Sequence, residues 1–223
     1  MLELRGVSYR YPGARRPAID GIDLRVAGGE VVGVIGPNEA GKSTLCLVAS
    51  GLAPASIGGE LSGEVRLEAA SLAGLRPWEL AGRTGIVFAD PSSQRSGVTS
   101  TVVEEVAFGP INLGLPRDET QARTSSAMRL LGIEALAERH PGHLSGGQAQ
   151  LVAIASILAM RPRVVILDEP VAELDDEGRT LVRDALRAIA ANGTGILIAE
   201  HDIALLRDLG ARIVSLRDGR VAT

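Results

Sequence analysis

The sequence predicts an α/β fold with a mostly parallel core sheet, for three reasons. Short β-branched runs alternate along the chain with longer helical patterns. The runs at residues 164–167 and 196–199 are continuously apolar, as is typical of strands buried on both faces of a parallel sheet. The stretch from about residue 90 to residue 160 lacks strand patterns and is mainly helical, which predicts a helical subdomain inserted between two sheet strands.

The predicted elements are taken in chain order. Strands are predicted at Leu2–Val7, Glu30–Ile35, Glu64–Leu67, Thr84–Phe88, Val164–Leu167, Gly195–Ala199 and Arg212–Leu216. Helices are predicted at Lys42–Ala49, Arg117–Leu131, Gly147–Met160, Asp176–Ala191 and Ile203–Leu209. The length of 223 residues suits one large domain, in which residues 1–89 and 161–223 form the core and about 90–160 form the subdomain.

Composition and charge argue against several classes of protein. The formal net charge is −4 with no basic run, so a nucleic-acid partner is not expected. Aromatic residues make up only 2% of the chain, too few for a single-strand stacking surface. The longest apolar stretches, such as Leu151–Met160, are too short to span a bilayer. We therefore expect a cytoplasmic domain that reaches a membrane only through a partner. The lone Cys46 excludes a disulfide framework.

A glycine-rich motif of the form G-x-x-x-x-G-K-[S/T] lies between a predicted strand and a predicted helix. Its residues are Gly36, Pro37, Asn38, Glu39, Ala40, Gly41, Lys42 and Ser43, with Thr44 next. Glycines let the backbone approach phosphates closely, so that amide N–H groups and the helix N-terminus face the negative charge. Lys42 can reach the β- and γ-phosphates, and the Ser43 hydroxyl can hold Mg²⁺. The motif predicts that the chain binds ATP and Mg²⁺.

Glu39 is an awkward residue in such a loop. Its carboxylate lies beside a site for polyphosphate, where Coulomb repulsion is unfavourable unless the side chain points away. We expect it to face solvent or a partner surface.

Two acids follow the apolar strand at residues 164–167. Alternation along a strand sends Asp168 and Glu169 to opposite sides, so they can take different roles. We expect Asp168 to support Mg²⁺ through water and Glu169 to act as the general base that polarises the attacking water. His201 follows the next strand. It is either a helix-entry residue before the capping Asp202 or a γ-phosphate contact, and its place one strand beyond the acids favours the second role.

The pentapeptide Leu144, Ser145, Gly146, Gly147 and Gln148 precedes a long apolar helix and forms a second anion-binding helix terminus. Because the phosphate loop already supplies one such terminus, the second suggests another nucleotide or a dimer. This pentapeptide resembles the signature motif of the ATP-binding cassette (ABC) ATPases. Together with the phosphate loop and the acidic pair, it makes the sequence similar to that family over essentially the whole chain.

That resemblance implies a P-loop ABC cassette with N-terminal antiparallel strands beside the parallel core sheet. It also implies a head-to-tail pair with a second ABC ATPase, as a homodimer or a heterodimer. Each ATP would lie between the phosphate loop of one subunit and the signature (144–148) of the other. Asp175 matches the D-loop at the dimer seam, and Tyr11 the aromatic residue that stacks on adenine.

Three stretches, at residues 7–13, 103–110 and 112–116, resemble the ATPases of energy-coupling factor (ECF) transporters, which import vitamins and transition-metal ions. The resemblance implies an integral membrane subunit as partner, with this chain at the cytoplasmic face of the membrane. Phe108, flanked by glycine and proline, matches the segment that receives that subunit; ordinary helix packing is the alternative.

One position departs from the family pattern: Ala89 stands where members carry a glutamine that contacts Mg²⁺ and the attacking water. Asp90 and Gln94 are the candidates to substitute for it. Its absence predicts slow hydrolysis at this site, within an asymmetric pair. Besides a transport ATPase, two functions stay open: a non-transport cassette in DNA repair or ribosome work, and a slow-hydrolysing regulatory cassette.

Overall fold

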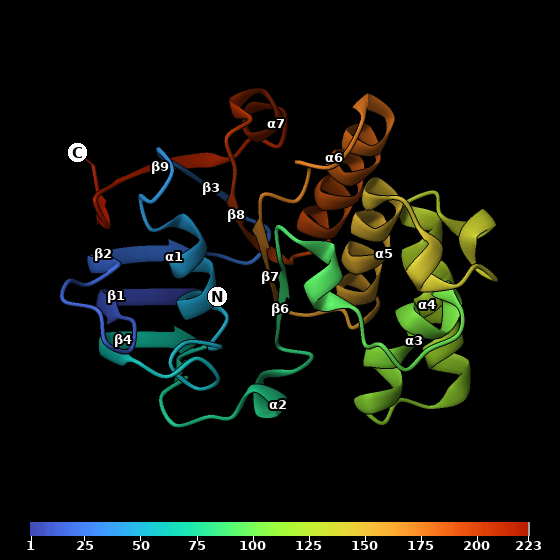
Figure 1. The fold of residues 1–223 in the computed structure, drawn as a ribbon, viewed down its shortest axis with the longest axis horizontal. Coiled ribbons are helices and arrows are strands. Elements are labelled where there is room, and N and C mark those ends of the chain that lie inside the picture. The colour runs from blue at the N-terminus through green and yellow to red at the C-terminus, as the bar shows by residue number, and fades with distance from the viewer. Residues whose placement is uncertain (223) are drawn as a thin grey trace.

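The computed structural model describes residues 1–222, which form two sheets and a group of helices beside them (Figure 1). The smaller sheet is antiparallel, with strand order β2–β1–β4–β5. Its strands are β1 (Leu2–Arg10), β2 (Ile19–Val26), β4 (Glu60–Leu67) and β5 (Ala70–Ser71). The antiparallel N-terminal strands that the family resemblance implied are therefore present.

The larger sheet has strand order β10–β9–β3–β8–β7–β6. Its strands are β3 (Val31–Ile35), β6 (Thr84–Val87), β7 (Val164–Asp168), β8 (Gly195–Ala199), β9 (Arg212–Arg217) and β10 (Arg220–Val221). All neighbouring pairs except β9–β10 are parallel. Every residue of β7 and β8 is buried, which explains the continuous apolar runs at residues 164–167 and 196–199. The predicted mostly parallel sheet is confirmed.

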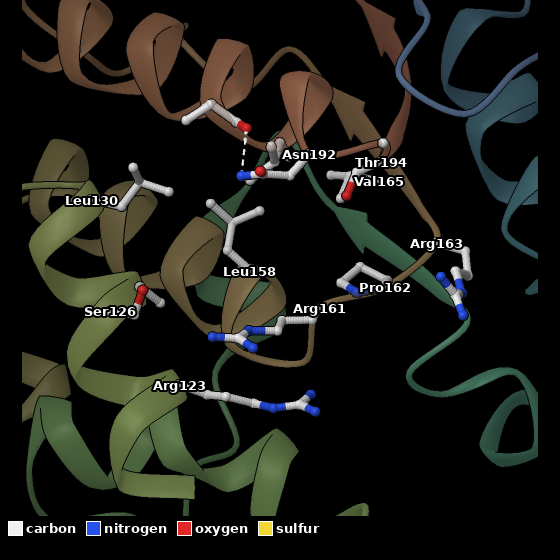
Figure 2. Close-up of a pocket in the computed structure, with 14 residues that line it drawn as sticks. Arg123, Ser126, Leu130, Leu158, Arg161, Pro162, Arg163, Val165, Asn192 and Thr194 are labelled. Carbon is white, nitrogen blue, oxygen red and sulfur yellow. Dashed lines mark hydrogen bonds between the residues drawn. The ribbon is translucent and has the colours of Figure 1, made fainter. Parts of the chain in front are cut away.

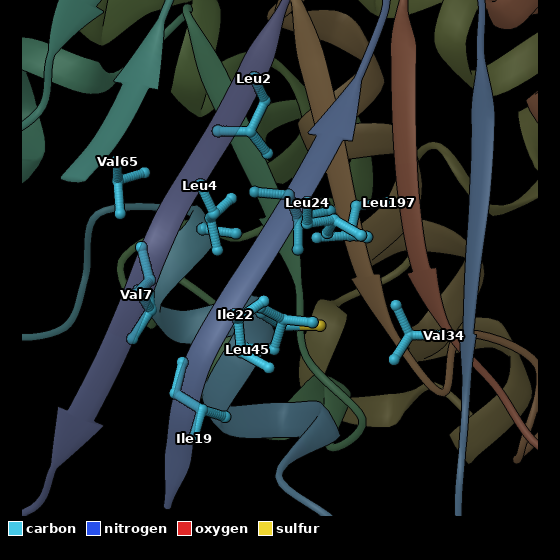
Figure 3. Packing of buried hydrophobic residues seen from close by; sticks show 14 of the residues in the cluster. Leu2, Leu4, Val7, Ile19, Ile22, Leu24, Val34, Leu45, Val65 and Leu197 are labelled. Carbon is cyan, nitrogen blue, oxygen red and sulfur yellow. The ribbon is translucent and has the colours of Figure 1, made fainter. Parts of the chain in front are cut away.

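Helix α1 (Lys42–Ala49) packs between the two sheets. Figure 3 shows Leu45 from this helix among Leu4 and Ile22 of the small sheet and Leu197 of the large one. Leu45 is 1% exposed, and burying such a side chain stabilises the fold by about 2 kcal/mol. This packing fixes the helix whose first residues end the phosphate loop.

The remaining helices are α2 (Pro77–Leu80), α3 (Val102–Asn112), α4 (Arg117–Leu130), α5 (Gly146–Ala159), α6 (Asp176–Ala191) and α7 (Ile203–Asp208). Helices α3, α4 and α5 pack on one another and lie to one side of the large sheet (Figure 1). A second apolar cluster joins them to the strands, with Val106, Met128 and Ile154 packed near Leu167. The helical character expected for residues 90–160 is thus found. Within residues 1–222, none of the helices is both long and apolar enough to cross a bilayer.

Five elements were not delimited in the sequence prediction: the short elements β5, α2 and β10, and the longer β2 and α3. Strand β2 was not predicted, because Gly21 interrupts its apolar alternation and the strand pairs with β1 through register shifts. Helix α3 was not delimited, although it begins at a capping box in which the Thr101 side chain accepts from the Glu104 amide. Pro110 lies inside this helix, and the proline masked its helical pattern.

Candidate nucleotide site

The phosphate loop runs from the end of β3 to the first turn of α1. Gly41 is the N-cap of α1 with φ 98°, and the described residues give this helix no side-chain cap. A Cβ atom on Gly41 would lie 2.6 Å from the carbonyl oxygen of Ala18, so the position requires glycine on steric as well as conformational grounds. The uncapped first-turn amides are free to donate to an anion.

Lys42 is 6% exposed and turns back over the loop. Its Nζ donates to the carbonyl oxygens of Gly36 at 3.1 Å and Pro37 at 3.3 Å. These neutral acceptors hold the ammonium beside the loop, where phosphate oxygens can replace them as stronger, charged acceptors.

A hollow of about 530 Å³ opens over this loop. Its lining includes six loop and helix residues, Asn38, Glu39, Gly41, Lys42, Ser43 and Thr44, together with Glu169. Residues 16–18 and 218–219 complete the wall, and sequence reasoning missed both segments because their approach depends on long-range strand pairing. The hollow brings the phosphate loop and the predicted general base together.

Glu39 is exposed at the mouth of this hollow, with φ 65°. That left-handed conformation costs a non-glycine residue about 1 kcal/mol. Because Glu39 is exposed, its side chain is in solvent, but its charge remains beside the site expected for a polyphosphate.

Asp168 and Ser43 form the candidate metal site. Asp168 is 8% exposed, and its Oδ1 has no hydrogen-bond partner within residues 1–222. Burial raises the pKa of this carboxyl, the nearby Ser43 hydroxyl lowers it, Glu169 raises it and Lys42 lowers it. A buried, unpartnered carboxylate oxygen beside a hydroxyl fits Mg²⁺, which takes oxygen ligands from one or two protein groups and the substrate phosphates.

Glu169 lies just beyond β7 with φ 49°, so a left-handed turn rather than strand alternation separates its side chain from that of Asp168. Its Oε1 is 3.1 Å from Nε2 of His201, and both side chains are partly exposed. The structure therefore places the predicted base and the predicted γ-phosphate contact side by side.

Glu200 was missed by sequence reasoning, although it precedes His201 directly. It is 5% exposed, and its Oε1 accepts from the backbone amides of His201 at 2.7 Å and Asp202 at 3.2 Å. Burial raises the pKa of this carboxyl, the two amides lower it, and Glu169 and Asp202 raise it. Glu200 holds the backbone on which His201 sits.

The signature residues lie elsewhere, at the N-terminus of α5. Ser145 is the N-cap: its Oγ accepts from the Gln148 amide at 3.3 Å, and the Gln148 side chain accepts from the Ser145 amide at 3.2 Å. A second hollow, of about 640 Å³, lies beside this terminus and is lined by Gly146, Leu144, Ala89 and Glu169. The signature therefore does not line the hollow over the phosphate loop.

The two candidates to replace the missing glutamine are both engaged elsewhere. Gln94 accepts from the Phe88 amide and donates to the Ile86 carbonyl, each at 3.1 Å, which fastens the segment after β6. Asp90 accepts from the amide and hydroxyl of Ser92, both at 2.8 Å. In this structure neither side chain takes the place left at Ala89.

Three other predicted residues have definite places. The Tyr11 hydroxyl is 3.1 Å from the Thr44 hydroxyl, and its ring meets Tyr9 edge-on, so it touches the phosphate-loop helix. Asp175 is the N-cap of α6 and accepts from the Gly178 amide at 2.8 Å. Phe108, on α3, is 39% exposed.

A separate hollow of about 540 Å³ lies between α4, the end of α5 and the end of α6 (Figure 2). Arg123 and Arg161 project along it, and Leu158 forms part of its apolar floor (Figure 2). Its lining shares no residue with the two hollows described above, so it is separate from the candidate nucleotide site.

Comparison with known proteins gives consistent matches. The family model for "ABC transporter" matches residues 19–172. The energy-coupling factor transporter ATP-binding protein EcfA of Methanothermobacter thermautotrophicus is 38% identical, over 99% of this chain and 69% of its own length. The cobalt import ATP-binding protein CbiO of Syntrophus aciditrophicus is 36% identical, over 99% of this chain and 76% of its own.

Solved structures also resemble the fold over the whole chain. A dimeric post-hydrolysis ATP-binding cassette bound to ADP and Pi has a TM-score of 0.87 at 27% identity, covering 100% of this chain and 97% of that one. The cbiO1 structure from Clostridium perfringens, part of the ABC transporter complex cbiONQ, has a TM-score of 0.84 at 33% identity, covering 100% and 86%.

Proposed function

The chain belongs to the ABC transporter family as an ATP-hydrolysing subunit, and we propose that it powers an importer of the ECF type for a vitamin or transition-metal ion. The similarity to EcfA and CbiO proteins supports an import role. In this proposal the chain pairs head to tail with a second ABC ATPase and docks on an integral membrane subunit at the cytoplasmic face of the membrane.

The observation that carries the proposal is the division of the site within one chain. The hollow over Lys42 and Ser43 contains the phosphate loop and Glu169 but none of the signature residues of α5. A triphosphate bound there would contact the uncapped α1 terminus on one side and no signature residue of the same chain on the other. A second copy or a related cassette would supply the signature from the other side, and this closes the pair around ATP.

The chemistry follows from the residues of the site. Glu169 takes a proton from the attacking water as general base. Lys42 and the α1 amides stabilise the charge on the β- and γ-phosphates, and His201 donates from Nε2 to a γ-phosphate oxygen. When bound by Ser43 and Asp168, Mg²⁺ supplies further neutralisation of the phosphate charge. Hydrolysis removes the γ-phosphate that both subunits grip, so the pair reopens and the membrane subunit follows.

The exposed side of α3 is the proposed contact for the membrane subunit. Phe108 and Ile111, three residues apart on this helix, are 39% and 59% exposed. Adjacent exposed apolar side chains on one face are typical of a protein interface. Selectivity for the imported substrate then resides in the membrane subunit.

Transport by a reconstituted complex tests this function. A complex purified from detergent-extracted membranes is reconstituted in vesicles, and ATP-driven uptake of vitamins and of metal ions is measured. We expect uptake to be lost with Phe108→Asp while ATP binding is retained; Ile57→Asp, which changes a side chain 38% exposed outside α3, serves as the control. Stimulation of ATPase by DNA or ribosomes, without any membrane partner, would support the non-transport function instead.

A further inference from the structure

Arg179, in the first turns of α6, joins two loops that are far apart in sequence. Its Nε donates to the Leu174 carbonyl at 3.1 Å, and its Nη1 donates to Asp202 Oδ2 at 3.0 Å. Leu174 directly precedes Asp175, the residue that matches the D-loop at the proposed dimer seam. Asp202 directly follows His201. One guanidinium therefore bridges the seam segment and the segment that carries the γ-phosphate contact.

The Asp202 end of this bridge is held from several directions. The other carboxylate oxygen of Asp202 accepts from the first amides of α7, at Ala204 and Leu205. The backbone amides of His201 and Asp202 both donate to Glu200. The backbone that carries the His201 side chain is therefore held next to Asp202, and the imidazole itself lies 3.1 Å from Glu169. A displacement of Arg179 would therefore be passed to His201.

The Leu174 end is fixed to α6. Asp175 caps this helix through the Gly178 amide, and the Arg179 amide donates to the Asp175 carbonyl at 2.9 Å. The guanidinium is planar and presents its donors in a rigid fork, so it can fix two acceptors at a set angle. A lysine ammonium in the same place offers a point charge on a flexible stem and cannot hold that geometry.

Stability alone gives a weak reason for this arrangement. The Arg179 and Asp202 side chains are 40% and 30% exposed, and such an ion pair stabilises a fold by about 1 kcal/mol or less. The arrangement matters because it fixes Leu174 and Asp202 relative to each other.

We propose that Arg179 is a positioning residue: it couples the Leu174–Asp175 segment at the dimer seam to His201, so that docking of the second cassette sets the imidazole against Glu169 and the γ-phosphate. This inference rests on the head-to-tail pair of the proposed function and adds a route by which pairing controls hydrolysis.

Three variants test it: Arg179→Ala, Arg179→Lys and, as matched control, Arg183→Ala. Arg183 lies one turn further along α6 and pairs with the carboxylates of Asp184 and Asp208 instead. We measure ATP affinity, kcat of the paired enzyme, and NMR spectra labelled at histidine. The chain has only three histidines, so the His201 signal can be followed against His140 and His143.

We expect Arg179→Ala to lower kcat about tenfold with ATP affinity within about twofold of wild type, because a small misplacement of a reacting group costs rate rather than binding. Arg179→Lys recovers only part of this loss, and the His201 signal alone moves. An unchanged kcat would overturn the inference, as would an equal loss in Arg183→Ala or movement of all three histidine signals. If ATP hydrolysis by the wild-type chain did not depend on Lys42, the proposed function itself would be overturned instead.

Discussion

Helices α1 and α5 both begin with residues suited to binding an anion, but their N-termini are capped differently. The α1 terminus has Gly41 as N-cap, no side-chain cap among the described residues, and the buried Lys42 beside it. The α5 terminus is closed by the reciprocal hydrogen bonds of Ser145 and Gln148, and Ser145 is exposed.

The difference indicates which terminus binds phosphate by itself. An uncapped terminus with an adjacent ammonium offers free donors and charge, whereas a capped one must exchange existing hydrogen bonds for the ligand. We infer that α1 holds ATP in the single chain and that α5 contributes only to a nucleotide already held by a second cassette. The predictions below test this division, starting with the largest expected effect.

Glu169→Gln separates chemistry from binding at the α1 terminus. Removal of a general base lowers the rate by roughly 100-fold or more, so we expect kcat of the paired enzyme to fall by that factor while ATP affinity is kept. ATPase assays and equilibrium nucleotide binding measure the two quantities. The control is Glu177→Gln, an exposed acid in the first turn of α6. An unchanged ATPase rate in Glu169→Gln would support the regulatory cassette.

Ala89→Gln tests whether the α1 site is slow for want of one side chain. Ala89 and Glu169 line the same hollow, where an added amide would help to orient the attacking water. We expect kcat to rise about tenfold through better positioning of the reactants. Single-turnover hydrolysis measures the chemical step, and a rate that stays at the wild-type value would refute the hypothesis of slow hydrolysis.

Glu39 and Glu173 provide a matched pair of carboxylates, one beside each terminus. Glu39 lines the phosphate-loop hollow, and Glu173 Oε2 approaches Gly146 at the α5 terminus. Removing the Glu39 charge reduces Coulomb repulsion by about 1 kcal/mol, so Glu39→Gln should tighten ATP binding to the single chain about fivefold at low salt. Glu173→Gln should leave that affinity unchanged. Equal effects of the two substitutions on the single chain would remove the distinction between the termini.

Asp168→Asn should stabilise the nucleotide-free chain. Because burial raises the folded-state pKa of Asp168 above its unfolded value, the unfolded chain ionises first, and stability falls as pH rises through the window between the two values. At neutral pH the substitution removes this cost and should add about 1 kcal/mol to the free energy of unfolding. Thermal unfolding at acidic and neutral pH measures it. The same variant should lose magnesium-dependent tightening of ATP binding, and lower stability at neutral pH would contradict the account.

Much of the phosphate-binding region was predictable, because its determinants are local. The bounds of α1 and α6 match the sequence prediction. The phosphate loop, the two acids at the end of β7 and His201 follow from the order of strands, loops and helices alone. The same order predicted the parallel sheet through the apolar runs of β7 and β8.

Other features depend on contacts between distant segments. The pairing of β2 with β1, the approach of residues 16–18 to the phosphate loop and the bridge from Arg179 to Asp202 leave no local pattern. The left-handed turn at Glu169 was also not foreseen, because a strand reading assigns its direction by alternation. The two hydrogen bonds of the Gln94 side chain, to the Phe88 amide and the Ile86 carbonyl, likewise have no local sequence pattern.

Complementation between two defective chains tests the divided site most directly. Lys42→Ala removes the phosphate-binding ammonium, whereas Ser145→Asp keeps a good N-cap on α5 but opposes the partner's triphosphate with a negative charge. Ser145→Asn, which caps equally well without charge, is the control. Each defective chain alone should be inactive in ATP hydrolysis, and an equal mixture should recover about a quarter of the wild-type rate, since half of the random head-to-tail pairs regain one of two sites. No recovery in a mixture of folded chains, beside an active wild type, would contradict the account.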